Sequence, residues 1–200
     1  MKKEIYMSNC NRTAVLVLGL VAIATPSFAD GSIKGTVDAK PAKFLADTIV
    51  YVKEVPKTKL TAKTVQIDQK GMAFDPHISL IAVGDTVKFL NDDKVDHNVM
   101  SSDGGYDLGT WGTGASKSYE FKKAGVFGQV CKIHPEMLAY VFVGQNRFAA
   151  VVDGKGNFSI SGVPAGSYEL DVWNPKLKAP AQKITVAADG SATANFSLTR

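Results

Sequence analysis

The sequence contains few of the residues that build disulfide-rich folds or catalytic centres. Its 200 residues include only two cysteines and three histidines, and the formal net charge is +4. The chain shows no internal repeat, and its pair Gly104-Gly105 lies between polar residues, as in a flexible turn rather than a phosphate-binding loop. So weak a charge provides no strong field for nucleic acid, and we expect no nucleic-acid partner.

A long hydrophobic run is also missing. The most apolar stretch, Ala14–Thr25, follows a basic start and ends at Pro26. About 12 apolar residues are too few to cross ~30 Å of hydrocarbon, which argues against a membrane anchor. Small residues at Ser27 and Ala29 match the cleavage site of a secretory signal peptide. We therefore expect residues 1–29 to be a signal peptide cleaved near Ala29, and the mature protein to be periplasmic with no membrane span.

Loss of this leader would remove Cys10 and leave Cys131 as a lone thiol in a compartment where paired thiols oxidise. Two interpretations are open: an inert buried cysteine, or a thiolate held by a metal ion. The neighbours of Cys131 favour the metal. The segment Cys-Lys-Ile-His-Pro-Glu-Met offers the thiolate, the imidazole of His134 and the thioether of Met137, and His97 supplies a second imidazole from an upstream β run.

One thiolate, two imidazoles and one thioether suit copper in a one-electron role. We predict one mononuclear copper ion with the ligands His97, Cys131, His134 and Met137. Zinc is the main alternative, but methionine is a poor zinc ligand, so a zinc site would have to recruit Asp96 or Glu136. The third histidine, His77, is expected at the surface or beside the ligands. Five aspartates predict a solvated acidic loop, with partner docking as the alternative: Asp92, Asp93, Asp96, Asp103 and Asp107.

Short runs rich in Val, Ile, Thr, Phe and Tyr alternate with Gly, Pro, Asn and Asp, and no long stretch has a helical period. Regular spacing of this kind predicts an all-β sandwich or barrel with Greek-key links. The glycine-rich stretch 101–116 is expected to be one long surface loop, and residues 54–63 a solvated linker. The predicted strands cover residues 32–37, 47–54, 62–68, 78–82, 85–90, 96–100, 117–122, 126–131, 138–143, 148–152, 157–160, 167–173, 181–187 and 193–198.

The order His-Asn-Val, followed by Cys-x-x-His-Pro-x-Met after a Gly-Val-Phe strand, resembles the blue-copper cupredoxins, amicyanin and plastocyanin among them. The resemblance covers residues 62–144. It implies a trigonal site with Met137 as a weak axial ligand, a hydrogen bond from Asn98 to the cysteine loop, and Pro135 as a stiffener of that loop. It also implies an electron carrier rather than an enzyme, with the edge of His134 as the electron port and a redox protein, a dehydrogenase or a cytochrome, as the partner.

The flanking segments resemble a different module. The turn Val163-Pro164-Ala165-Gly166 before Tyr168-Glu169-Leu170 is similar to the carboxypeptidase regulatory-like, transthyretin-like β-sandwich, and residues 30–56 look like its first strands. We therefore expect a second, smaller sandwich of residues 30–56 and 146–200, split around the cupredoxin. The whole arrangement resembles bacterial proteins described as methylamine-utilisation or plastocyanin-like.

Two functions remain open at this point. The first is a periplasmic electron carrier, and the second is a copper-binding module for storage, delivery or sensing. A multicopper enzyme is not supported, because three histidines cannot build a trinuclear centre and the ligand loop has no second cysteine for a dinuclear one. The oligomeric state does not follow from the sequence.

Overall fold

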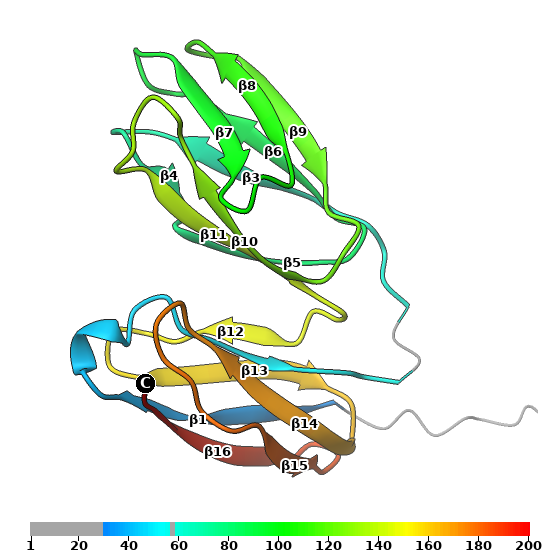
Figure 1. Cartoon of the computed structure of the whole chain (residues 1–200). Coiled ribbons are helices and arrows are strands. Elements are labelled where there is room, and N and C mark those ends of the chain that lie inside the picture. The colour runs from blue at the N-terminus through cyan, green and yellow to red at the C-terminus, as the bar shows by residue number, and fades with distance from the viewer. Residues whose placement is uncertain (1–29, 57–58) are drawn as a thin grey trace, which may run out of the picture.

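The computed structural model describes residues 30–56 and 59–200, so the predicted signal peptide lies outside the described residues. These residues form two β-sandwiches stacked on one another (Figure 1). The prediction of a nearly all-β fold is confirmed, since the one helix among the described residues is the 3-10 turn η1 (Ala42–Phe44). Within this part of the chain, no helix has the length and apolar character needed to cross a membrane.

The first sandwich consists of the central part of the chain. One sheet has the order β5 (Ile78–Ala82), β11 (Leu138–Gly144), β10 (Gly125–Val130), β7 (His97–Ser101) and β8 (Asp107–Trp111). The other has the order β4 (Phe74–Asp75), β3 (Thr64–Gln69), β6 (Thr86–Leu90) and β9 (Ser116–Glu120). Alternating residues of these strands, such as Val87 and Phe89 in β6, point inward and are fully buried.

The second sandwich combines both ends of the described chain. Its smaller sheet has the order β13 (Asn157–Val163), β1 (Gly31–Ala39) and β16 (Ser191–Leu198). Its larger sheet has the order β12 (Ala149–Val151), β2 (Ile49–Val52), β14 (Gly166–Trp173) and β15 (Gln182–Val186). Both N-terminal strands are internal strands of these sheets. Gly35 permits the close approach of β1 and β16, because a Cβ there would lie 1.6 Å from the carbonyl oxygen of Ala194.

Each predicted run contains a strand, but the prediction of a single loop over residues 101–116 is wrong. β8 lies within it and pairs antiparallel with β7, with His97 opposite Trp111 and Asn98 opposite Thr110. The register shifts further along this pair, and Gly109 adopts a φ of 74° in β8. Glycine supplies this left-handed conformation at little cost, so here it marks an irregular strand rather than a loop. The two-residue strand β4 and η1 are also absent from the prediction.

Aromatic and ionic contacts join the two sandwiches. The Tyr51 ring of β2 lies 4.8 Å from the Phe142 ring of β11, measured between centroids. Trp173 lies 5.0 Å from Tyr140 on the same scale. At the margin of this contact the Nε2 atom of His77 lies 2.8 Å from Asp47. The second sandwich therefore covers the outer face of the first at β11.

A buried ion pair fastens the connection between the sandwiches. Arg147, between β11 and β12, donates from Nη1 and Nη2 to the two oxygens of Asp85 at 2.6 and 2.8 Å, and from Nη2 to the carbonyl of Thr61 at 2.7 Å. The Asp85 side chain is fully buried and also accepts the backbone N–H groups of Lys63 and Ala82. Burial alone would raise the pKa of Asp85, but Arg147 and these backbone donors outweigh it and lower the pKa to about 2.

This ion pair predicts a loss of stability in acid. Because the pKa of Asp85 is about 2 in the folded protein and about 4 in an unfolded chain, its contribution is complete above pH ~4 and is lost as the pH falls towards 2. The loss should amount to about 2 kcal/mol of unfolding free energy. Denaturant titrations between pH 6 and pH 2.5 would measure it, with Asp85→Asn as the control that lacks this titration. Equal pH slopes for the two proteins would contradict the assignment.

Candidate metal centre

Sheet pairing brings the predicted ligands together. β7 and β10 are antiparallel neighbours, with Val130 opposite Met100, so the chain that leaves β10 at Cys131 runs back towards the start of β7. His97 is the first residue of β7, and Cys131 directly follows β10. The loop that continues from Cys131 carries His134 before β11 begins. Residues from two distant parts of the sequence therefore meet at one end of the sandwich.

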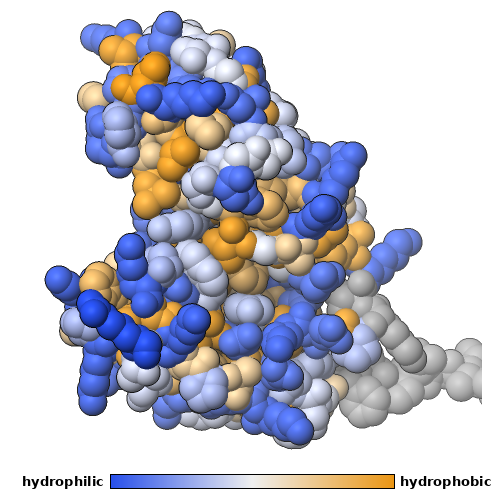
Figure 2. Space-filling view, viewed as in Figure 1, coloured by the Kyte–Doolittle hydropathy of each residue, from blue (hydrophilic) through white to orange (hydrophobic). Residues whose placement is uncertain are grey.

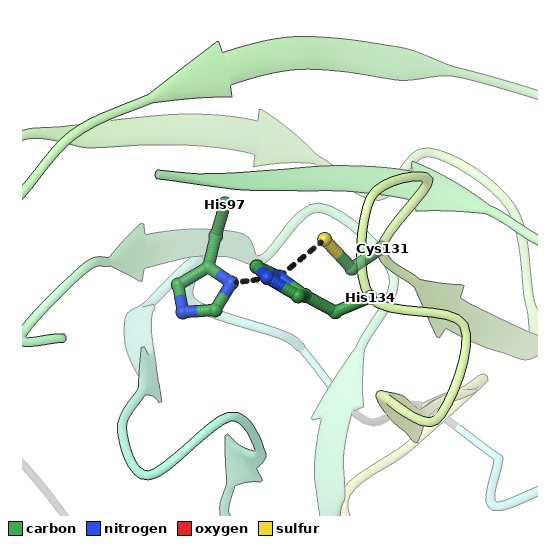
Figure 3. A group of neighbouring side chains, drawn as sticks. All are labelled: His97, Cys131 and His134. Carbon is green, nitrogen blue, oxygen red and sulfur yellow. Dashed lines mark hydrogen bonds between the residues drawn. The ribbon is translucent and has the colours of Figure 1, made fainter. Parts of the chain in front are cut away.

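Three of the four predicted ligands form a compact cluster. The ligand atoms of His97, Cys131 and His134 all lie within 4.8 Å of one another. The two Nδ1 atoms are 3.0 Å apart, and the Cys131 sulfur is 3.7 Å from Nδ1 of His134 (Figure 3). His97 is fully buried and Cys131 is 3% exposed, whereas His134 is partly exposed. The cluster is therefore dry on one side and reaches solvent through one imidazole.

The hydrogen bond at Nε2 of His97 determines which of its ring nitrogens carries the proton. Nε2 of His97 lies 2.8 Å from a carboxylate oxygen of Asp93. The backbone N–H of Met72 is the main cause that lowers the pKa of Asp93; burial opposes it, and the bonds to His97 and Gly71 lower it further. The carboxylate is thus the acceptor, Nε2 carries the proton, and Nδ1 presents a lone pair to the cluster.

This donor set fits a metal ion. Two ring nitrogens that each lie about 2.0 Å from a common ion are separated by about 3 Å, the separation observed between His97 and His134. A sulfur atom beside two imidazoles is the combination that favours copper among the common metals. The residues present therefore fit a copper ion.

Asn98 connects the strand of His97 to the cysteine loop. Its backbone N–H donates to the Cys131 sulfur at 3.3 Å, and its side-chain oxygen accepts the backbone N–H of Lys132 at 3.2 Å. Its Nδ2 atom donates to Asp107 of β8 at 2.8 Å, and Asp107 also pairs with the Lys132 ammonium group. The hydrogen bond from Lys132 is the main cause that lowers the pKa of Asp107. These contacts hold the Cys131 side chain against β7.

Met137 and His77 are the two predicted residues outside this cluster, and each has its own surroundings. Met137 is 1% exposed and belongs to the same hydrophobic cluster as Cys131, at the end of the ligand loop. Its backbone N–H donates to the carbonyl of His134 at 3.0 Å, which closes the loop into a turn. His77 lies at the contact between the sandwiches, where it pairs with Asp47.

Two carboxylates near the site did not stand out in the sequence. Asp93 and Asp107 belong to the acidic stretch expected to be a solvated loop, yet one binds His97 and the other binds Asn98 and Lys132. For Asp93 a local signal exists, since a carboxylate four residues before a ligand histidine can reach its ring. For Asp107 there is none, because its contact depends on the unpredicted strand β8.

Comparison with known families agrees with this geometry. Residues 61–144 match the family described as copper binding proteins, plastocyanin/azurin family. This part of the chain is cupredoxin-like. Members of this family bind one copper ion, and the cluster of His97, Cys131 and His134 is the candidate site for it. A second family, described as polysaccharide lyase family 4, domain II, matches residues 142–194, so a further β domain accompanies the cupredoxin.

Several solved structures resemble the cupredoxin part. A novel purple cupredoxin from Nitrosopumilus maritimus is 28% identical over 40% of this chain and 98% of its own, with a TM-score of 0.37. A reduced amicyanin variant is 25% identical over 44% of this chain and 86% of its own, with a TM-score of 0.38. The copper-containing nitrite reductase of Thermus scotoductus SA-01 is 25% identical over 48% of this chain and 25% of its own, with a TM-score of 0.40. Among curated proteins no significant match was found.

Proposed function

We propose that the protein is a periplasmic type 1 copper protein that carries single electrons between redox partners. The ligands in this proposal are His97, Cys131, His134 and Met137, with the thioether in the weak axial position. The observation that carries it is the convergence of two Nδ1 atoms and one sulfur, with His134 alone reaching solvent. When bound, copper would supply a one-electron Cu(II)/Cu(I) couple.

The surroundings of the cluster suit an electron carrier because they restrict movement of the ligands. His97 is a strand residue held by Asp93, and Cys131 receives the N–H of Asn98. The ligand loop is tied at both ends, by Asn98 to Lys132 and by the turn from Met137 to His134. A site that keeps one geometry in both oxidation states has little to reorganise when an electron moves.

Exposed apolar side chains occur in the segments that hold the site. Of the large hydrophobic residues exposed in the described part of the chain, four belong to these segments: Met72, Val95, Ile133 and Leu138, with exposed fractions of 44, 46, 49 and 39%. Figure 2 shows orange areas of this kind on the first sandwich, above the notch between the two sandwiches. An apolar surface beside a partly exposed ligand favours brief docking of a redox protein, for which we propose a dehydrogenase or a cytochrome.

We propose that the second sandwich is a separate domain without a role in catalysis. We also propose that the protein is not an enzyme. Its extent in this proposal is residues 30–56 and 146–200, with the cupredoxin of residues 62–144 inserted. The pairing of β1 with β13 and β16, and of β2 with β12 and β14, supports this division.

Redox titration of the purified, copper-loaded protein tests the proposed function. An electron carrier should show a reversible one-electron couple and fast self-exchange between oxidised and reduced copies, because the ligands stay in place. A protein for copper storage, delivery or sensing should instead lose copper rapidly to a chelator and exchange electrons slowly. That second outcome would replace electron transfer as the function, while leaving the copper site intact.

A further inference from the structure

A turn that is distant from the ligand loop in sequence holds the carboxylate that binds His97. Gly71 and Met72, between β3 and β4, have consecutive positive φ angles of 64° and 58°. They form a tight turn, with the Lys70 N–H donating to the carbonyl of Ala73, and successive N–H groups in a turn can form an anion-binding concavity. Gly71 N–H donates to Oδ1 of Asp93 at 2.6 Å, and Met72 N–H donates to Oδ2 at 2.8 Å. The turn therefore fixes both oxygens of this carboxylate.

The same carboxylate meets the candidate ligand. Oδ2 of Asp93 lies 2.8 Å from Nε2 of His97, and the two side chains are 15% and 0% exposed. Asp93 is held from its own backbone as well, since its N–H donates to Asn91 at 3.0 Å. A carboxylate held by the N–H groups of the turn thus selects the tautomer of the buried His97 ring and the direction in which its Nδ1 atom points.

We propose that Asp93 is a positioning residue for the metal, which directs Nδ1 of His97 towards Cys131 and His134 and ties the ligand to the turn at Gly71 and Met72. The inference rests on the proposed copper site. A carboxylate on the outer nitrogen of a ligand histidine fixes the ring and raises its basicity, and removing such a partner weakens metal binding about 10- to 100-fold.

These hydrogen bonds connect an exposed apolar residue, Met72, to His97. Met72 is 44% exposed, and its backbone N–H is one of the donors that hold Asp93. A partner that moves the turn on docking therefore moves the carboxylate that orients His97. Only two hydrogen bonds separate Met72 from the imidazole ring of His97.

Asp93→Asn removes the charge and keeps the size of the side chain. Competition with a copper chelator should show a loss of Cu(II) affinity of about 10- to 100-fold. Nitrogen-15 NMR of the metal-free protein should show His97 changing from a single Nε2-protonated tautomer to a mixture. Asp96→Asn is the matched control, since Asp96 adjoins His97 in sequence, carries the same charge and is exposed. It should leave the tautomer unchanged and lower the affinity less than twofold.

The inference is overturned if Asp93→Asn and Asp96→Asn give the same tautomer and the same affinity. Failure of the copper site is recognised separately, because the wild-type protein would then bind Cu(II) without a thiolate-to-copper band. If Asp93→Asn does not fold, Gly71→Ala tests the same link while keeping the carboxylate. An added Cβ at Gly71 meets no atom within 4 Å, so it disturbs only the left-handed backbone. The affinity should fall in the same direction, and an unchanged value would refute the link.

Discussion

Cys131→Ser should abolish the intense visible absorption of the copper-loaded protein. The absorption of a type 1 site arises from charge transfer between a thiolate and Cu(II), and a serine hydroxyl is neither ionised at neutral pH nor a soft ligand. Cys131 is 3% exposed, and its sulfur accepts the N–H of Asn98 at 3.3 Å, a contact that suits a thiolate. The expected change is from a strong band to none above the weak absorption of ordinary Cu(II). Visible and electron-spin spectra of both proteins would measure it.

Met137→Leu is the matched control for this substitution. Leucine is close to methionine in volume, so the buried end of the loop should remain packed. Loss of a weak axial ligand should leave a coloured site with an altered reduction potential. A Cys131→Ser protein that stays blue would show that the proposed ligands are wrong, and a colourless Met137→Leu protein would show that the thioether is more than a weak ligand.

Arg147→Ala should destabilise the fold by up to about 3 to 5 kcal/mol, the cost of removing one partner from a fully buried ion pair; here Asp85 is fully buried and the Arg147 side chain is 29% exposed. The carboxylate of Asp85 has no exposed surface and would lose two charged hydrogen bonds, while the carbonyl of Thr61 would lose its donor. Adding Asp85→Asn should restore part of the stability, because the neutral amide leaves no unpaired charge. Urea denaturation of the single and double variants would measure both effects.

An exposed ion pair provides the comparison. Lys53 and Glu169 are 2.7 Å apart with side-chain exposures of 45 and 46%, so Lys53→Ala should leave the stability almost unchanged. An Arg147→Ala protein as stable as Lys53→Ala would mean that water reaches Asp85 once the guanidinium is gone. In that case the connection between the sandwiches would contribute little to stability.

The strands were predictable wherever alternation in the sequence matches alternation in burial. In β6, for example, Val87 and Phe89 face the core and their neighbours do not. The ligand loop was predictable because Cys131 and His134 are nearly adjacent in sequence, and His97 because it begins a regular strand. In each case the signal lies within a few residues.

The other features depend on partners distant in the chain. β8 forms because Trp111 and Thr110 pair with β7. Gly109 makes the local composition resemble that of a loop, so the strand is not evident from the sequence. The concavity that holds Asp93 requires positive φ angles at Gly71 and Met72, and Met72 gives no local sign of such a conformation. Asp107 reaches Asn98 and Lys132 only once β8 is in place.

The chain leaves the second sandwich at the end of β2 and returns at the start of β12, and these two points are neighbours. Tyr51 is opposite Ala149 in the sheet, and the N–H of Val52 donates to the carbonyl of Phe148 at 2.9 Å. The first sandwich is consequently joined to the second by two chain connections that start side by side, not by one. Two neighbouring connections restrict rotation of one sandwich relative to the other, so the candidate metal centre keeps a constant direction relative to the second sandwich.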